Sequence, residues 1–490
     1  MTRASRISLG FGGCVLAAAA LDGGFTPVSW GWETLGLLLL VAASALLSHR
    51  PHVARGGLFV LAGLAGLALW QLASLAWSVS TPLTALEPQH TAVLVAGVTA
   101  ALLWLERGDL DAVATGLLLA VTVVCSWNLL SRLGAGSDTG DDAAPIGYTN
   151  GLALLAVFGI LLAVGAAVQH RGRARLAAFA CIGPCATVLV LSQSRGAQAA
   201  LIVGAGVAAA SRLRSPRAAV LAVTAAGVAA EAGLAVAASA ERRAYWAVAI
   251  SEWERAPLLG SGGGTWGRVW LEHRGQPFPA LDAHSLYLQA LSELGPIGVA
   301  LLVLVLLPPL LAGVPARSPV ARAVLGAYGA FVAHLAVDFS WQLTAVSLTG
   351  LALGTALLAD GARVDVPARV VLPVAAAAAA FSVALLAGNT LTALAESALR
   401  RGDMTAARAS ARRASALAPW SSEPWRLRGE AERGLGRPRE ASGSFRVGLE
   451  RDPGDVELWR ALARVTAGRE RQHALERALA LDPFGARPSG

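Results

Sequence analysis

The chain has 490 residues, of which 55% are hydrophobic and 15% are charged, and its mean hydropathy is +0.56. These values exclude a soluble globular protein and predict a polytopic membrane protein with a polar appendage. The formal net charge of +8 comes from arginine, because the sequence contains no lysine. Most of these arginines are expected to set the membrane topology, and the charge needs no nucleic-acid partner to explain it.

Apolar runs near the roughly 20 residues that cross a bilayer predict about 12 to 13 transmembrane helices. In chain order they cover about residues 8–21, 31–48, 56–77, 90–105, 112–132, 149–169, 175–193, 196–211, 217–239, 292–314, 319–337, 341–360 and 368–397. The first run resembles a signal peptide, but no convincing cleavage site follows it, which favours a retained signal anchor. We therefore expect an all-α membrane bundle over residues 1–397.

Arginines alternate between the loops of this bundle. Most short-loop arginines fall on the side of the N-terminus: Arg50, Arg55, Arg107, Arg171, Arg173, Arg175, Arg212, Arg214, Arg217, Arg317, Arg322, Arg363 and Arg369. The opposite short loops hold Arg132 and Arg195. The positive-inside rule then places the N-terminus in the cytoplasm, with the long loop of about 240–291 and the tail after 397 on the outer side.

The tail, residues 398–490, is rich in Arg, Glu and Ala, and it repeats. Trp425 recurs as Trp459, and Pro419 recurs as Pro453, at the spacing of about 34 residues that is typical of tetratricopeptide helix pairs. This pattern predicts a C-terminal α-solenoid of helical repeats that binds a protein partner or assists assembly. A plain helical cap is the alternative.

Two other groups of residues suggest metal or redox chemistry only weakly. Cys14, Cys125, Cys181 and Cys185 all lie in apolar runs, where a free cysteine acts as a small hydrophobic residue. Asp138, Asp141 and Asp142 form an acidic cluster in a Gly-rich outer loop, but hard cations need more oxygen ligands than this loop offers. We expect no metal and no cofactor.

The outer side carries the candidate chemistry. Ser194, Arg195 and Gly196 interrupt two apolar runs, and an arginine there is costly unless it meets an anion or a carboxylate. A guanidinium with neighbouring hydroxyls suits a phosphate, because its planar fork donates two hydrogen bonds to phosphate oxygens. An interfacial arginine that extends its side chain to the headgroups is the alternative.

The long loop opens with Arg242 and Arg243 in an amphipathic stretch that also contains Trp246. This stretch is typical of an interfacial helix, which could hold Arg242 or Arg243 over a lipid phosphate or leave both solvated. Residues 257–266 follow and are too rich in glycine for a helix. They lack the Lys of a nucleotide-binding P-loop, and their glycines favour tight turns and close approach of the backbone to a ligand.

His284 is the candidate base, although a lone histidine is more often structural. The leucines that follow it recur at helical spacing, which places His284 near a helix start at the outer rim. A neutral histidine can take a proton from a sugar hydroxyl as that oxygen becomes a nucleophile. Asn150 and Asp338, each at the outer end of a predicted span, are candidates for glycan or supporting contacts.

These residues resemble, in order, the superfamily of O-antigen ligases, O-antigen polymerases and O-linked oligosaccharyltransferases. The resemblance covers roughly residues 60–360 and rests on an ordered set of short motifs: Ala76-Trp77-Ser78, the stretch from Pro145 to Asn150, Ser194-Arg195-Gly196, Arg242 before Trp246, Pro257 to Gly260, His284 with Tyr287, Gln289, Glu293 and Gly295, and Val337-Asp338-Phe339. The chain departs from the family at Ser285, where Asn is frequent, and the repeat tail lies outside the minimal architecture.

The resemblance implies a metal-independent, inverting glycosyltransferase of the membrane-embedded C type. Its donor would be an undecaprenyl-diphosphate-linked glycan, and its acceptor a lipid, a glycan or a protein. The roles carried over are diphosphate binding by Arg195 and Arg242 and acceptor activation by His284. Arg243 is a possible substitute for Arg242, and Ser194, Asn150, Tyr287 and Asp338 are further candidates for substrate binding.

Two readings from other classes stay open. A transporter of the same lipid-linked glycan would also need outer arginines, but it should show paired broken helices in two matching halves, and no such symmetry is visible in the sequence. A membrane scaffold that works through its repeats would leave Arg195 and His284 without a role. Within the superfamily, a ligase, a polymerase and a protein oligosaccharyltransferase cannot be separated by hydropathy.

Overall fold

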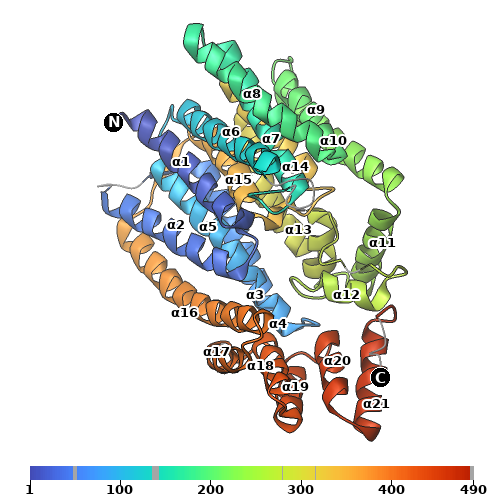
Figure 1. The fold of residues 1–490 in the computed structure, drawn as a ribbon. Coiled ribbons are helices and arrows are strands. Elements are labelled where there is room, and N and C mark those ends of the chain that lie inside the picture. Colours follow the sequence, from blue (N-terminus) through green and yellow to red (C-terminus); the bar gives the residue numbers. More distant parts are fainter. Residues whose placement is uncertain (48–51, 135–142, 279, 315, 486–490) are drawn as a thin grey trace.

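A computed structural model describes residues 1–47, 52–134, 143–278, 280–314 and 316–485 (Figure 1). A helix covers each predicted span: α1 (Arg3–Ala20), α2 (Pro27–Leu47), α3 (Arg55–Ser74), α5 (Glu87–Trp104), α6 (Leu110–Gly134), α7 (Thr149–Gln169), α8 (Gly172–Ser192), α9 (Arg195–Ala210), α10 (Pro216–Ala238), α13 (Leu286–Gly313), α14 (Pro319–His334), α15 (Thr344–Leu358) and α16 (Ala368–Arg400). This arrangement confirms the all-α class.

Within the described residues, 8 helices are long and apolar enough to cross a membrane, namely α2, α3, α6, α7, α8, α10, α13 and α16. This number is lower than the predicted 12 to 13. Helices α9 and α15 are apolar but shorter, and α14 has only 16 residues. Helices α1 and α5 have 18 residues each and spend part of that length on polar side chains. The chain is a multi-pass membrane protein.

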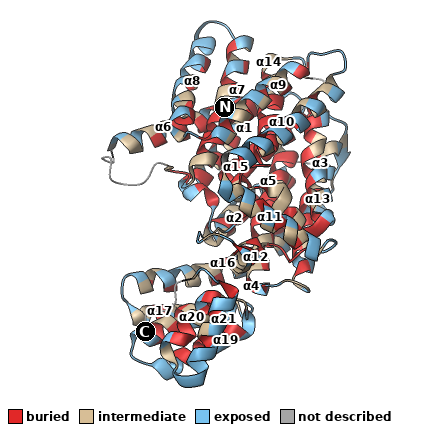
Figure 2. Cartoon of the chain, turned by 90° about the vertical axis from the view of Figure 1, so that its right-hand side faces the viewer, coloured by how far each residue is buried: buried red, intermediate tan, exposed pale blue. Residues whose placement is uncertain are grey.

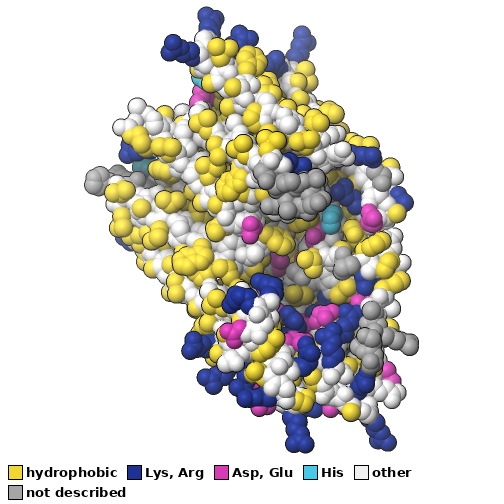
Figure 3. All heavy atoms as spheres, viewed as in Figure 1, with side chains coloured by type: hydrophobic (Ala, Val, Ile, Leu, Met, Phe, Trp, Pro, Cys, Tyr) yellow, Lys and Arg dark blue, Asp and Glu magenta, His cyan; other side chains and the backbone are white. Residues whose placement is uncertain are grey.

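The helices form a bundle with a buried centre and an apolar flank. In α7, 78% of the most apolar window is buried, whereas the corresponding share in α16 is 17% (Figure 2). Large apolar side chains on the flank, such as Leu39, Leu69 and Ile202, are 71%, 66% and 74% exposed. Figure 3 shows hydrophobic side chains over this flank and arginines gathered at the two ends. Such a surface suits a hydrocarbon environment between two polar layers.

Shorter elements complete the fold. Strands β1 (His52–Ala54) and β2 (Arg363–Asp365) pair antiparallel, with Val53 opposite Val364, and they join two loops that are far apart in the sequence. Helix α4 (Thr81–Thr84) and the 3-10 turns η1 (Asp22–Gly24) and η2 (Ser340–Gln342) lie in connections. The predicted long loop contains α11 (Ala240–Arg255) and α12 (Trp266–His273).

The tail consists of α17 (Met404–Leu417), α18 (Glu423–Gly434), α19 (Pro438–Arg451), α20 (Val456–Val465) and α21 (Gly468–Leu481). Its small residues let the helices of a pair approach closely. A Cβ atom on Gly429 would lie 2.3 Å from the ring of Phe445, and Ala441 is fully buried. The predicted boundary at residue 398 falls inside α16, which continues from the bundle into the tail, and it stays a prediction. Helices α11, α12 and α17–α21 lie at one end of the bundle (Figure 1).

Candidate functional site

Helices α7, α9, α10, α11 and α14 contribute to a cavity of about 360 Å³ at the end of the bundle that carries the 240–291 loop. It is lined by Asn150, Gln193, Ser194, Arg195, Gly196, Ala199, Glu231, Leu234, Ala235, Ser239, Arg242, His334 and Val337. Four predicted site residues, Asn150, Ser194, Arg195 and Arg242, therefore line the same space. The described part of the chain brings them together from segments that are far apart in the sequence.

Local geometry presents Arg195 to the cavity. Helix α8 ends at Gln193, which adopts a left-handed conformation with a φ of 50°. The Ser194 hydroxyl then caps α9 by accepting a hydrogen bond of 3.3 Å from the backbone N–H of Ala197. Arg195 is the first residue of α9, and its guanidinium forms no ion pair with any described residue. The predicted break between two apolar helices is thus a tight, capped turn that carries an unpaired cation.

Arg242 and Arg243 both lie in the first turn of α11, and their side chains point to different places. The Ser239 hydroxyl accepts a hydrogen bond of 3.1 Å from the backbone N–H of Arg242 and so caps this helix. Arg242 lines the cavity, whereas the Arg243 guanidinium turns back and donates 2.6 Å to the carbonyl of Val236. Between the two candidates, the geometry favours Arg242.

Glu231 and His334 also line the cavity, and the sequence analysis did not single them out. The ring Nδ1 of His334 lies 3.8 Å from a Glu231 carboxylate oxygen, and Nε2 lies 3.8 Å from a carboxylate oxygen of Asp338. Both residues fall inside predicted spans, at 217–239 and 319–337. An ionisable residue within an apolar span is a functional-site signal, and that signal could have found them.

Gly196 explains why α9 can lie so close to this histidine. A Cβ atom at position 196 would lie 3.1 Å from Cε1 and 3.3 Å from Nδ1 of His334. These separations are tighter than ordinary van der Waals contact. The glycine that follows Arg195 therefore lets the first turn of α9 approach the His334 ring.

Asp338 is buried and fully hydrogen-bonded. One carboxylate oxygen accepts from the Tyr148 hydroxyl at 2.7 Å and from the Asn150 amide at 2.9 Å. The other accepts from the Ser340 backbone N–H at 2.9 Å and from the Ser340 hydroxyl. The carboxylate is thus committed to holding Asn150 at the cavity wall. Its predicted contact with substrate stays a prediction, and the structure gives it a supporting position.

His284 lies beside this cavity and does not line it. Its ring centroid is 5.4 Å from that of Phe339, the residue after Asp338, and 5.4 Å from that of Tyr245 on α11. The backbone around it is fixed, because the indole N–H of Trp246 donates 3.0 Å to the carbonyl of Ala283. The rings of Tyr245 and Phe339 therefore flank His284, and neither residue lines the cavity.

Asp282 orients the His284 ring. Its carboxylate lies 2.9 Å from Nδ1 and also accepts a hydrogen bond of 2.8 Å from the backbone N–H of His284. His284 adopts an unusual φ of 51°. Burial lowers the pKa of His284, but the hydrogen bond and charge of Asp282, with the charge of Asp338, outweigh it and leave the pKa above its ordinary value. With Nδ1 facing Asp282, Nε2 has no hydrogen-bond partner among the described residues and can act as the base.

Ser285 and Tyr287 have structural contacts. The Ser285 hydroxyl caps α13 by accepting from the backbone N–H of Leu288 at 3.4 Å. Serine at this position thus serves as a helix cap, whatever contact an amide would make. The Tyr287 hydroxyl donates 2.7 Å to the carbonyl of Val332 and ties α13 to α14. Its predicted role in substrate binding remains untested.

The Gly-rich segment packs closely against the protein's own backbone, whereas the sequence predicted a close approach to a ligand. Gly260 has a φ of 70°, and a Cβ there would lie 2.3 Å from the backbone of Glu293. The Glu293 carboxylate accepts 2.9 Å hydrogen bonds from the backbone N–H groups of Gly264 and Trp266. These contacts fix α12 against α13, so the glycines position the His284 helix by close backbone packing.

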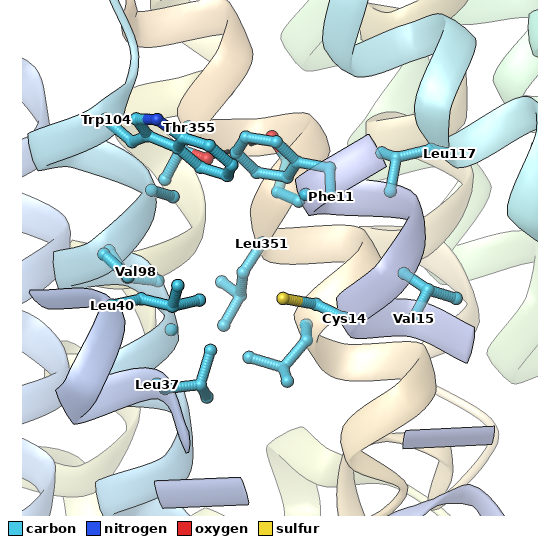
Figure 4. A pocket seen from close by; sticks show the side chains of 16 residues that line it. Phe11, Cys14, Val15, Leu37, Leu40, Val98, Trp104, Leu117, Leu351 and Thr355 are labelled. Atoms are coloured by element: carbon cyan, nitrogen blue, oxygen red, sulfur yellow. Dashed lines mark hydrogen bonds between the residues drawn. The ribbon is translucent and has the colours of Figure 1, made fainter. Parts of the chain in front are cut away.

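Other candidate features offer less chemistry. The apolar pocket between α1, α2, α5, α6 and α15 has no charged side chain in its lining (Figure 4). The four cysteines are free. The described residues contain no group of three His, Cys, Asp or Glu side chains that could hold a metal ion. The acidic cluster of Asp138, Asp141 and Asp142 lies outside the described residues.

The fold and the cavity define a multi-pass membrane protein with an arginine-lined cavity beside the 240–291 loop and a tail of helical repeats. Residues 177–303 match a family model described as O-antigen ligase, and residues 422–465 match one described as tetratricopeptide repeat. These matches confirm the resemblance and the repeats predicted from the sequence. They support a membrane enzyme that transfers glycans and resembles a ligase or polymerase. No curated protein matches the chain.

The ligase match contains Arg195, Arg242 and His284, and it ends inside α13. Glu231 lies within it, whereas His334 and Asp338 lie beyond it. The cavity therefore combines residues of the matched segment with residues of α14 and the turn that follows it.

Proposed function

We propose that the protein transfers a glycan from an undecaprenyl-diphosphate-linked donor to an acceptor hydroxyl on the outer side of the bacterial cytoplasmic membrane. The observation that carries the proposal is the pair Arg195 and Arg242. They come from different helices, line one cavity, and form no ion pair with any described residue. Two unpaired guanidinium groups with Ser194 and Asn150 beside them suit an anion that has several oxygens, such as a diphosphate.

In this proposal Arg195 and Arg242 hold the donor diphosphate, and His284 activates the acceptor. The Nε2 atom of His284 takes the proton of the acceptor hydroxyl as its oxygen attacks the anomeric carbon. The bond from that carbon to the diphosphate oxygen breaks, and its electron pair stays on the diphosphate. The arginines stabilise the charge that develops there. One displacement inverts the anomeric configuration and, in this scheme, uses no metal ion.

The positions of the remaining residues support specific roles. Asp282 holds the His284 ring through Nδ1, and Asp338 holds Asn150 at the cavity wall. The rings of Tyr245 and Phe339 lie beside His284 and would contact the glycan of the donor. The repeat tail, docked beside the outer loop, would recruit a protein acceptor or a partner of the glycan assembly machinery.

The test uses the purified full chain in liposomes with a labelled undecaprenyl-diphosphate glycan. We expect the label to appear on an acceptor, and the H284A variant to lose this transfer while it still binds the donor. Label on a growing glycan identifies a polymerase, label on a protein hydroxyl an oligosaccharyltransferase, and label on a lipid acceptor a ligase. Unchanged transfer by H284A would refute the proposed base.

A lipid-linked glycan transporter is the alternative from another class. It would move the intact donor across the bilayer and form no new glycosidic bond. The same liposomes separate the two, because accessibility of the donor on each leaflet can be followed together with its chemical state. If intact donor moves between the leaflets and no acceptor becomes labelled, the protein is a transporter and the glycosyltransferase proposal is refuted.

A further inference from the structure

The cavity contains two ionisable groups that the proposed reaction does not use. Glu231 is 2% exposed and His334 is 1% exposed, and both line the cavity. Neither ring nitrogen of His334 and neither carboxylate oxygen of Glu231 has a hydrogen-bond partner in the described part of the chain. Burial of an ionisable group without hydrogen-bond partners costs free energy. A ligand or a bound proton in the cavity would supply the missing partner.

The geometry places the His334 ring between two carboxylates. Its nitrogens lie 3.8 Å from Glu231 on one side and 3.8 Å from Asp338 on the other. These separations are too long for direct hydrogen bonds but short enough for strong electrostatic interaction away from bulk water. Asp338 already accepts from Tyr148, Asn150 and Ser340, whereas Glu231 accepts from none of the described groups. Glu231 and His334 are therefore the pair that can share a proton.

The surrounding charges explain when that proton is needed. The charged and titratable groups around His334 are Glu231 on α10, Asp338 after α14, Arg195 on α9, Arg242 on α11, Tyr148 beside α7 and Tyr287 on α13. Both arginines and Glu231 line the cavity, and Asp338 lies on the other side of the His334 ring. A diphosphate brings at least two further negative charges, and in a poorly hydrated site they repel an ionised Glu231.

We propose that Glu231 and His334 form a proton-holding pair that takes up a proton from water when a diphosphate enters the cavity and releases it when the diphosphate leaves. This inference rests on the proposed function and deepens it, because it assigns a second class of group to the diphosphate site. It makes Glu231 and His334 positioning residues for the ligand. The acceptor proton still goes to His284, so the uptake balances separately from the transfer step.

The experiment measures proton uptake on binding of inorganic pyrophosphate to the purified full chain in detergent. Titration calorimetry in two buffers with different ionisation enthalpies gives the number of protons taken up per pyrophosphate. The ionisation of pyrophosphate contributes the same amount to every variant. We expect H334Q and the near-isosteric E231Q to lose the part of the uptake that the protein supplies. Once the ionisation of pyrophosphate itself is subtracted, the affinity of E231Q for pyrophosphate should be the same at alkaline and at acidic pH.

The controls keep the inference separate from the proposed function. The H170Q variant removes a histidine at the far end of α7 and should leave the uptake unchanged. If R195A abolishes binding while E231Q and H334Q keep the full uptake, the proton-holding pair is refuted and the diphosphate site stands. If the wild-type chain does not bind pyrophosphate, both are overturned. Should H334Q fail to fold, E231Q alone decides, because it changes only one atom of the side chain.

Discussion

Two groups of charged side chains in this molecule differ in their contacts: four at the junction of the tail are buried and paired, whereas in the cavity Arg195 is exposed, Arg242 is half-buried, and Glu231 and His334 are buried. Where the tail meets the outer loop, Arg274 pairs with Asp482 at 2.5 Å and Arg268 pairs with Asp452 at 2.9 Å, and each of these four side chains is at most 10% exposed. In the cavity, Arg195 and Arg242 form no ion pair with described residues, and Glu231 and His334 have no hydrogen-bond partner there.

The presence or absence of partners separates charges that stabilise the fold from charges that are available to bind a ligand. Asp482 accepts hydrogen bonds from two arginines, because Arg460 also donates one of 2.7 Å to its carboxylate. Arg274 donates a further hydrogen bond of 2.7 Å to the carbonyl of Pro277. Burial raises the pKa of Asp482, but these two guanidinium groups outweigh it and hold the pKa below its usual range. A buried ion pair with complete hydrogen bonding tolerates its desolvation. The buried Glu231 and His334 lack such partners among the described residues, so their desolvation is not offset.

Removal of a cavity arginine should give the largest effect and should separate function from stability. We expect R195A to reduce glycan transfer roughly 100- to 1,000-fold, because it removes a charge aimed at the departing diphosphate. The melting temperature should change little, since the guanidinium has no ion-pair partner to lose. Transfer rate and thermal unfolding are measured on the same preparation. The R171A variant, in an exposed turn, is the control, and a large loss of stability in R195A would contradict the distinction.

Removal of a junction arginine should do the opposite. The R274A variant leaves Asp482 buried with one partner fewer, at a cost of about 3–5 kcal/mol for breaking a buried pair. The docked tail should then open more than about 100-fold more often. Hydrogen exchange of the α20 and α21 amides measures this opening. The matched control is R446A, whose partner Glu470 is exposed, and it should cost less than about 1 kcal/mol. Equal protection in R274A and the wild type would be the contrary result.

Filling the space at Gly196 should disturb the cavity without weakening the helix. A methyl group there presses on the His334 ring at 3.1 Å, so we expect G196A to lower transfer about tenfold. Alanine favours the helix by about 1 kcal/mol relative to glycine, so the melting temperature should not fall. The G183A variant, whose new Cβ meets nothing within 4 Å, is the control. Full activity in G196A would mean that the ring can shift freely.

A change at Asp282 should give the smallest effect, a displacement of the pH profile. The neutral base is populated above the pKa of His284, which Asp282 keeps above its ordinary value. In D282N that pKa falls, so the acidic limb of the profile of kcat/KM should move to lower pH, with a lower plateau from a weaker base. The D365N variant breaks a similar contact, His52 to Asp365, far from the site, and should not move the limb. An unmoved limb in D282N would assign the titration to another group.

Much of the fold was predictable because it follows from the physics of a bilayer. Apolar runs located every helix of the bundle, since a chain in hydrocarbon must satisfy its backbone internally. Hydropathy did not show which helices are long enough to span, because α9 and α15 are apolar but short. The pairing of β1 with β2 also escaped prediction, since three-residue strands carry almost no periodic pattern.

The candidate site was predictable in part. Arg195 and Arg242 line one cavity, and each lies near a capping serine at the start of its helix. Glu231 and His334 were hidden in apolar runs, where hydropathy averages over a single polar residue. Glu231 and His334 lie close together because α10 packs against α14, and this packing cannot be read from the hydropathy of the sequence. The role of the Gly-rich segment also required the structure, because only there does its backbone contact with Glu293 appear.

The junction at Asp452 has a consequence for how the molecule is made. This one carboxylate accepts from Arg268 in the outer loop and also, at 2.8 Å, from Ser80 between α3 and α4. Ser80 precedes Asp452 by 372 positions, and Arg268 precedes it by 184. During synthesis, both segments therefore lack this partner until the repeats have been made. A chain interrupted before Asp452 would contain every helix of the bundle yet lack this contact to the 240–291 loop.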